Sequence, residues 1–305
     1  MPMFKTILVP LDGSKLSEQA LPLAQRLAKA TGARLELIRV HSPPTARDVY
    51  MEAMAGGAVP VSETTAEEEA YLDEQAAETR AEGVEVNTSL LDGPVAQAIG
   101  RRARATADLV VMTTHGRGPF SRVWLGSVAD ELLRILDRAI LLIRPTMEPW
   151  ATAGGPPYRR ILLPLDAWDG NTDAVETAIA LGSPKTEYVL VHVVDVPVPA
   201  VAMPIPMGAA AMSIDALESK VAERLEGIAN SLSGRGLKVR TRVEFASSAA
   251  QGILDVAESE APDLIAMATR RPGRIERMLL GSVTDKVVRA SKEPVLVVPA
   301  RLARS

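Results

Sequence analysis

The feature that most constrains the fold of this 305-residue chain is an internal repeat. The segment "KTILVPLDGS" near the N-terminus returns as "RRILLPLDAWDG", and "LGSVADELLR" returns as "LGSVTDKVVR". The spacing is nearly constant, since Asp12 and Asp166 are 154 positions apart and Gly126 and Gly281 are 155 apart. A repeat of this length is the size of a whole domain. The sequence therefore predicts two copies of one domain, arranged head to tail.

The junction between the copies is rich in proline and glycine, with the sequence "PTMEPWATAGGPPY". Such a composition is typical of a linker. We predict a first domain over residues 1–146, a linker over 147–158 and a second domain over 159–305.

Within each copy, short apolar runs alternate with stretches of helical period, which is typical of βαβ units on a parallel sheet. We predict an α/β fold in each copy, a doubly wound five-stranded parallel sheet flanked by helices. In the first copy the predicted strands are Thr6–Leu11, Arg34–Val40, Val84–Leu90, Leu109–Thr113 and Ala139–Ile143, and the predicted helices are Ser17–Ala30, Glu63–Glu82, Pro94–Ala105 and Val128–Leu136. Pro22 predicts a kink or a later helix start, and Pro94 suits a first helical position. The ligand site of such a fold lies beyond the carboxyl ends of the strands.

The loop after the fourth strand, within "MTTHGRGPFSRVWLGSVAD", has the features of an anion site. Gly116 allows a positive φ, and Gly126 precedes a helix that starts at Ser127 or Val128. The free amide groups and the dipole at a helix start attract anions. Two interpretations of the Ser127 hydroxyl remain open, a phosphate contact or an N-cap in a Ser-x-x-Asp arrangement with Asp130.

Three motifs of the first copy resemble the universal stress protein family: "VPLDGS" and "IRVH" at strand ends, and "THG" followed by nine residues and "GS". Nucleotide-binding members of that family carry Gly-x2-Gly-x9-Gly-Ser/Thr, and the resemblance covers both copies. It implies an adenine nucleotide alpha hydrolase-like fold and ATP with Mg²⁺ as the ligand. It places Asp12 against the adenosine, the backbone of Val40 against adenine and the glycine loop around the phosphates. The full implied set is Pro10, Leu11, Asp12, Val40, Thr113, Thr114, His115, Gly116, Arg117, Gly126, Ser127 and Val128.

Both copies depart from the family motif. In the first copy Thr113 replaces the first glycine, and threonine disfavours positive φ and adds bulk, which weakens the ATP inference. In the second copy Ala268 and Arg271 replace both loop glycines. The weaker second set that remains is Asp166, Val193, Gly281 and Ser282. We therefore expect one good nucleotide site per chain; the rival interpretation is that Arg270 and Arg271 bind a differently placed anion.

Composition narrows the remaining function classes. A net charge of −4 does not favour nucleic acid as a partner, and the absence of cysteine excludes disulfides and thiolate chemistry. The N-terminus lacks the pattern of a signal peptide, and no apolar run reaches the ~20 residues of a membrane span, so we expect a soluble cytoplasmic protein. The three histidines, His41, His115 and His192, show no metal-ligand spacing.

The leading functional hypothesis is an ATP-binding regulator of the stress response. A slow ATPase or phosphotransferase would need a charge stabiliser, for which Arg117, Arg122 and His115 are the nearby candidates. A scaffold that binds no nucleotide is the third hypothesis. The apolar last strand of each copy should form an exposed sheet edge, which invites pairing. Such strands pair between domains in the family, so the resemblance implies an internal pseudo-dimer of the two copies, and it also allows a homodimer and an unidentified protein partner.

Two other stretches allow weaker predictions. The segments His41–Glu63 and Asp195–Ser213, rich in Met, Pro and Ala, are mobile loops or, alternatively, lids or partner-binding surfaces. The acidic run "ETTAEEEAYLDEQAAE" is interpreted as the solvated face of a helix, with Tyr71 and Leu72 directed inward.

Overall fold

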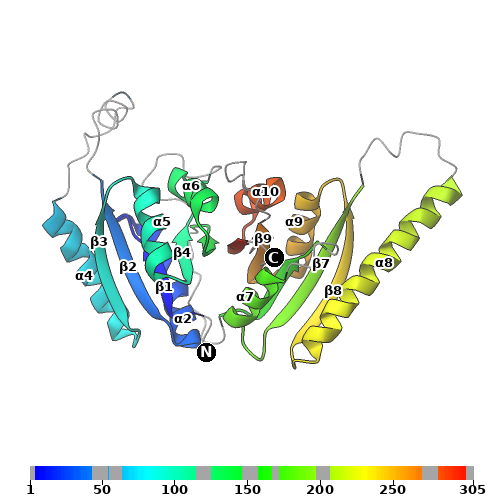
Figure 1. Ribbon diagram of the computed structural model, residues 1–305, viewed down its shortest axis with the longest axis horizontal. Helices are drawn as coiled ribbons and strands as arrows, with labels where there is room; N and C mark the ends of the chain where they lie inside the picture. Colours follow the sequence, from blue (N-terminus) through cyan, green and yellow to red (C-terminus); the bar gives the residue numbers. More distant parts are fainter. Residues whose placement is uncertain are drawn as a thin grey trace.

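The chain forms one ten-stranded sheet with helices on both faces, in a computed structural model that describes residues 4–42, 54, 64–114, 125–145, 157–166, 172–196, 207–269 and 281–299 (Figure 1). Short apolar strands alternate with amphipathic helices in both halves, as the sequence predicts. The predicted segments Leu109–Thr113 and Ala139–Ile143 are strands with those same bounds.

The first half contains five parallel strands and their crossover helices. In chain order its elements are β1 (Thr6–Pro10), α1 (Lys15–Glu18), α2 (Leu21–Thr31), β2 (Arg34–His41), α4 (Thr65–Ala81), β3 (Val86–Asp92), α5 (Val95–Thr106), β4 (Leu109–Thr113), α6 (Ser127–Ile135) and β5 (Ala139–Ile143). The second half repeats this order with β6 (Arg160–Pro164), α7 (Asp173–Leu181), β7 (Glu187–Asp195), α8 (Met207–Ser233), β8 (Lys238–Ala246), α9 (Ala249–Glu260), β9 (Leu264–Thr269), α10 (Ser282–Ala290) and β10 (Val295–Pro299).

The two halves meet through their last strands. The strand order is β3-β2-β1-β4-β5-β10-β9-β6-β7-β8, and β5 pairs antiparallel with β10, with Leu141 opposite Leu296. All other pairs are parallel. The predicted pairing of the two terminal strands is confirmed, and it leaves β3 and β8 as the edges of the common sheet.

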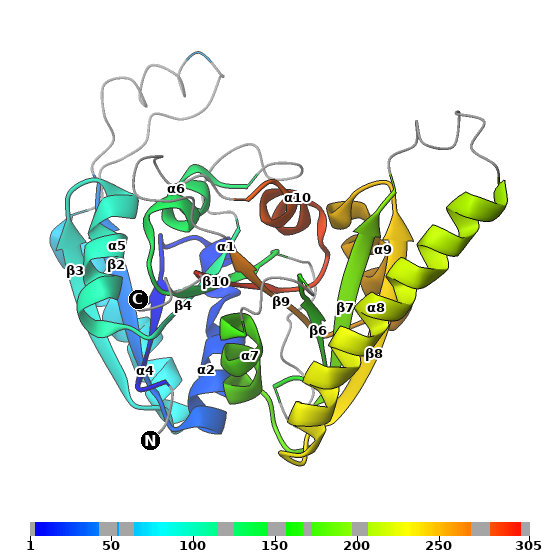
Figure 2. The ribbon, with the colours of Figure 1, turned by 45° about the vertical axis from the view of Figure 1, so that its right-hand side comes forward.

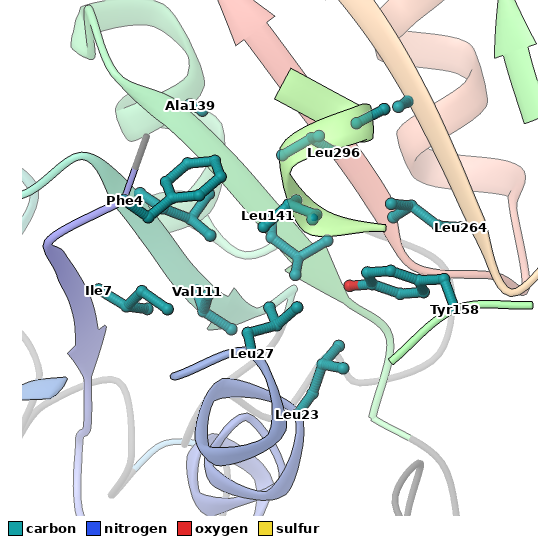
Figure 3. Packing of buried hydrophobic residues seen from close by; sticks show 14 of the residues in the cluster. Phe4, Ile7, Leu23, Leu27, Val111, Ala139, Leu141, Tyr158, Leu264 and Leu296 are labelled. Carbon is teal, nitrogen blue, oxygen red and sulfur yellow. The ribbon is translucent and has the colours of Figure 1, made fainter. Parts of the chain in front are cut away.

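Two hydrophobic layers cover the sheet, and each of them runs through both halves. Helices α2, α4, α7 and α8 pack on one face, and α5, α6, α9 and α10 pack on the other (Figures 1 and 2). At the junction Tyr158 lies in the same cluster as Leu27 and Leu141 of the first half and Leu264 of the second (Figure 3). The halves therefore share buried surface as well as backbone hydrogen bonds.

Proline fixes two helix starts in the first half. The predicted helix Ser17–Ala30 is divided into α1 and α2, and Pro22 occupies the first turn of α2, which confirms a later helix start. The sequence predicts Pro94 as the first helical residue of α5, but in the structure Pro94 is the N-cap that precedes the helix. No helix in the described ranges combines the length and the apolar composition that a membrane span needs.

Candidate functional site

A pocket of about 770 Å³ opens beyond the carboxyl ends of β1, β2 and β4, where strand order changes direction. Helices α5 and α6 supply one wall, and the first turn of α4 supplies Glu68 to another. The lining residues are Pro10, Leu11, Asp12, Ser17, Ile38, Arg39, Val40, Ser42, Glu68, Val95, Ile99, Met112, Thr113, Thr114, Leu125, Gly126, Ser127, Val128 and Ala129. An apolar slot thus adjoins a polar rim, which suits a ligand with one flat apolar part and one charged part.

Asp12 lies in the tight turn that follows β1. Its Oδ1 accepts hydrogen bonds from the Ser14 amide at 2.9 Å and the Ser14 hydroxyl at 2.6 Å. Gly13 has a φ of 80°, a left-handed conformation that glycine adopts without steric cost. The Leu11 amide donates to the Ile38 carbonyl at 2.8 Å, so the turn is tied to β2. These contacts hold the Asp12 carboxylate at the rim of the pocket.

The first turn of α6 directs backbone amides toward the pocket. Gly126 is the N-cap residue, without a side-chain cap, and Ser127 is the first helical residue. The interpretation of Ser127 as the N-cap is therefore wrong, because the extended residue that precedes the helix is Gly126. Since no side chain of the described residues caps this turn, its amides and the positive end of the helix dipole can attract an anion.

The two ends of the glycine-containing loop are fixed to the sheet. Thr114 donates its amide to the Ile143 carbonyl at 2.8 Å, and its own carbonyl accepts from the Gly126 amide at 2.8 Å. Thr113 is the last residue of β4 and pairs with Ile143. Its backbone is ordinary strand, and Ala261 is the one non-glycine residue with positive φ in the described ranges. The part of the sequence argument that rested on positive φ at Thr113 is therefore wrong, and Thr113 lines the pocket.

A buried ion cluster at the β2 end of the pocket was missed in the sequence. Glu68 of α4 is buried; its Oε1 lies 3.3 Å from Nε of Arg39 and its Oε2 lies 2.7 Å from Nδ1 of His41. The interpretation of the acidic run as a solvated face is wrong at this position, because Arg39 compensates the buried carboxylate. The charge of Arg39, four strand positions after Leu35 in an apolar strand, was the available signal.

Tyr71 packs against Arg39 of this cluster, and it turns inward as predicted. Its ring lies under the Arg39 guanidinium, 5.3 Å from centroid to Cζ, and its hydroxyl donates to Glu18 at 3.3 Å. Burial, with the nearby Glu18 carboxylate, raises the pKa of Tyr71, so the phenol stays neutral and donates.

The structure brings most of the predicted site residues together. Nine line the pocket: Pro10, Leu11, Asp12, Val40, Thr113, Thr114, Gly126, Ser127 and Val128. His115, Gly116 and Arg117, like the competing candidates Arg270 and Arg271, fall outside the described residues. So do most of the two Met/Pro-rich segments, although Met207–Ser213 belongs to helix α8. His192 contacts the Leu165 carbonyl through Nδ1 at 2.9 Å, as expected of a satisfied strand histidine.

Sequence comparison assigns the family. The sequence model of the universal stress protein family matches residues 3–144 and 157–299. The chain belongs to the universal stress protein family. Both halves match separately, so it carries the family's domain twice.

Curated relatives and solved structures agree. A universal stress protein of Methanocaldococcus jannaschii is 32% identical over 142 residues, which are 46% of this chain and 82% of the relative. One from Mycolicibacterium smegmatis is 28% identical over 308 residues and spans 97% of both chains. A solved universal stress protein from Archaeoglobus fulgidus, 19% identical, covers 96% of this chain and 98% of its own with a TM-score of 0.68. This last likeness supports the fold of the whole tandem chain.

In the second half, helix α9 packs unusually closely on strand β7 at one position. A Cβ atom at Gly252, four residues past the N-cap of α9, would lie 2.5 Å from Cγ1 of Val193. The equivalent position of α5, four residues past Pro94, is Ala98, which carries a real Cβ. Helix α9 therefore lies closer to its strand here than α5 can. In the described residues of either half, no three His, Asp or Glu side chains gather as metal ligands would.

Proposed function

We propose that this universal stress protein is a nucleotide-binding regulator whose first domain holds one ATP with Mg²⁺. The observation that carries the proposal is the pocket itself, which is lined by apolar residues and reaches the amino terminus of α6, where no described side chain caps the helix. The β- and γ-phosphates would bind the amides of Ser127 and Val128, and Mg²⁺ would bind as part of the Mg-ATP complex.

The orientation of the nucleotide follows from the two ends of the pocket. The anion-binding end would lie at α6, after β4, whereas Ile38 and Val40 belong to the carboxyl-terminal half of β2, on the far side of β1. The base would occupy this apolar end, and Asp12, between the two ends, would accept hydrogen bonds from the ribose hydroxyl groups. Bound ATP would supply the charge and the shape that a partner protein reads, and its occupancy would regulate that contact.

Two independent features favour a single site per chain. The second glycine loop has Ala268 and Arg271 at the glycine positions, and α9 approaches Val193 more closely than α5 approaches the equivalent part of β2. The loop substitutions would reduce the space for phosphates, and the closer packing of α9 on β7 shows that the second half does not reproduce the first at this position.

The test is to denature the gently purified protein and to quantify released nucleotide by mass spectrometry, followed by titration calorimetry of the nucleotide-free chain with Mg-ATP. We expect about one ATP per chain. Two equivalent sites would overturn the single-site proposal. No binding, even at millimolar Mg-ATP, would leave the scaffold hypothesis.

The repeat provides a matched pair of variants. Asp12→Ala removes charged hydrogen bonds to the ligand and should weaken ATP binding about tenfold or more. Asp166→Ala changes the aligned residue of the second domain and should leave the affinity at the wild-type value. Equal losses in the two variants would contradict the assignment of the site to the first domain.

A further inference from the structure

The repeated motif Gly-Ser-Val-x-Asp-x3-Arg has a second feature that the pocket does not explain. It places Asp130 and Arg134 on α6 and Asp285 and Arg289 on α10, each pair one helical turn apart. Within α6, Arg134 Nε lies 3.1 Å from Asp130 Oδ2. Within α10, Arg289 Nε lies 2.9 Å from Asp285 Oδ1.

These four side chains meet where the two domains join, because α6 and α10 stand side by side above the β5–β10 pair (Figures 1 and 2). Arg289 Nη2 donates to Asp130 Oδ1 across the junction at 2.9 Å. The Arg289 backbone is held as well, since its carbonyl accepts from Nη2 of Arg144 in the first domain at 3.0 Å. The two carboxylates also act together, because Asp130 and, more weakly, Asp285 raise the pKa of Arg134.

The ion pairs are distributed unequally between the two carboxylates, and Asp130 of the first domain has more of them. Asp130 receives both guanidinium groups, that of its own helix and that of α10. Each partner in the cross-domain pair is only 28% exposed, so solvent screens the pair incompletely. Among the described residues, Asp130 therefore pairs with two guanidinium groups, whereas Asp285 pairs with one.

The position of Asp130 explains why its pairing with arginine matters. It lies in the first turn of α6, directly after the pocket-lining residue Ala129. A carboxylate there offsets the positive end of the helix dipole and repels an incoming phosphate. A guanidinium group on the carboxylate removes this repulsion.

We infer that Arg289 of the second domain is a positioning residue for the anion-binding end of the first-domain pocket, through its ion pair with Asp130. This inference depends on the proposed nucleotide site. It gives the second domain a role that needs no nucleotide of its own: it completes the electrostatics of its neighbour. It also explains why the second copy keeps Asp and Arg in this motif although it has lost the loop glycines.

The test is titration calorimetry of the full chain with Mg-ATP and, separately, with adenosine. Arg289→Gln should weaken ATP binding about fivefold or more and change adenosine binding by no more than about twofold, because adenosine carries no phosphate. The control is Lys286→Gln, which removes the same charge from an exposed position of the same helix and should alter neither affinity.

A second variant tests the mechanism. In Asp130→Asn the repulsive charge is already absent, so adding Arg289→Gln to it should produce no further loss of ATP affinity. Unchanged ATP binding in Arg289→Gln, an equal loss for adenosine, an equal loss in Lys286→Gln, or a persistent loss in the Asp130→Asn background would each overturn the inference. Absence of binding to the wild-type chain would instead refute the proposed function, and this inference with it.

Discussion

At the residue scale, Tyr158 carries a polar group into the apolar centre of the junction. Its ring is buried among leucines of both domains, and its hydroxyl is the one buried side-chain polar atom of the described residues that lacks a hydrogen-bond partner. Burial raises the pKa of Tyr158, so the group stays a neutral phenol. An unsatisfied buried hydroxyl group loses its hydration without compensation.

We predict that Tyr158→Phe raises the free energy of unfolding by about 1 kcal/mol, because it keeps the ring and removes the unsatisfied hydroxyl group. Urea denaturation measures this increase, which should appear as a higher midpoint with an unchanged m-value. The control is Tyr71→Phe, which deletes a hydroxyl group that donates to Glu18 and should not stabilise the chain. A loss of stability in Tyr158→Phe would mean that the hydroxyl group has a partner.

Single residues also set the limit of what the sequence could predict about the site. Asp12, Val40 and Ser127 were found because strand ends and a helix start can be located from apolar periodicity and glycine positions. Glu68 was missed because its compensation by Arg39 joins residues 29 positions apart, on a helix and a strand whose packing no local pattern encodes. The objection that threonine disfavours positive φ does not apply to Thr113, because Thr113 is the last residue of strand β4 and has no positive φ.

At the scale of elements, β8 is one of the two edges of the common sheet, and its residues Arg240 and Arg242 belong to a ladder of ion pairs. Arg240 Nε lies 2.6 Å from Glu187 and its Nη2 lies 2.8 Å from Glu260, whereas Arg160 reaches Glu187 at 2.8 Å. Hydrogen bonds from Arg240 lower the pKa of both carboxyl groups below the ordinary value of 4.5. Charged side chains on an edge strand also oppose pairing with other chains.

This ladder predicts a pH-dependent contribution to stability. Both carboxyl groups have lower pKa values in the folded chain than in the unfolded chain, so their contribution is present above pH 4.5 and is lost as the pH falls through the folded values. Arg240→Gln should therefore lower the free energy of unfolding at pH 7 by about 1 kcal/mol or less, since Arg240 is half exposed. The difference from wild type should shrink toward pH 3 in urea titrations.

The matched control is Lys238→Gln, which removes a charge from the same strand at a residue without an ion pair among the described ones. Its effect on stability should not follow the titration of Glu187 and Glu260. A difference between Arg240→Gln and wild type that stays constant from pH 7 to pH 3 would contradict the ladder.

Elements were more predictable than the contacts between them. The strands of the first half were located within about two residues, because parallel strands buried on both faces appear as short apolar runs. Helix starts were less certain, since Gly126 and Pro94 act as caps only in the context of the folded loop. The edge position of β8 depends on the complete strand order and cannot be read from its own sequence.

At the scale of the whole molecule, the apolar terminal strands and the family resemblance together predicted that the two copies would pair, and the antiparallel β5–β10 pair is the reason that the two sheets become one. Leu141 and Leu296 are opposite each other and belong to the same hydrophobic layer. Ile140, one residue away, belongs to the layer on the other face. Because the chain has no cysteine, a pair of introduced cysteines can test this junction without competing thiols.

We predict that the double variant Leu141→Cys/Leu296→Cys forms a disulfide within one chain upon mild oxidation, because directly opposed antiparallel residues have Cα atoms about 4.5–5.5 Å apart. The oxidised form should exceed the reduced form in free energy of unfolding by about 2–4 kcal/mol, since the bond closes a long loop. The register control Ile140→Cys/Leu296→Cys places its thiols on opposite faces and should stay reduced. Non-reducing electrophoresis decides the outcome: cross-linked dimers would mean that β5 and β10 pair between chains, and the single sheet would then belong to two molecules.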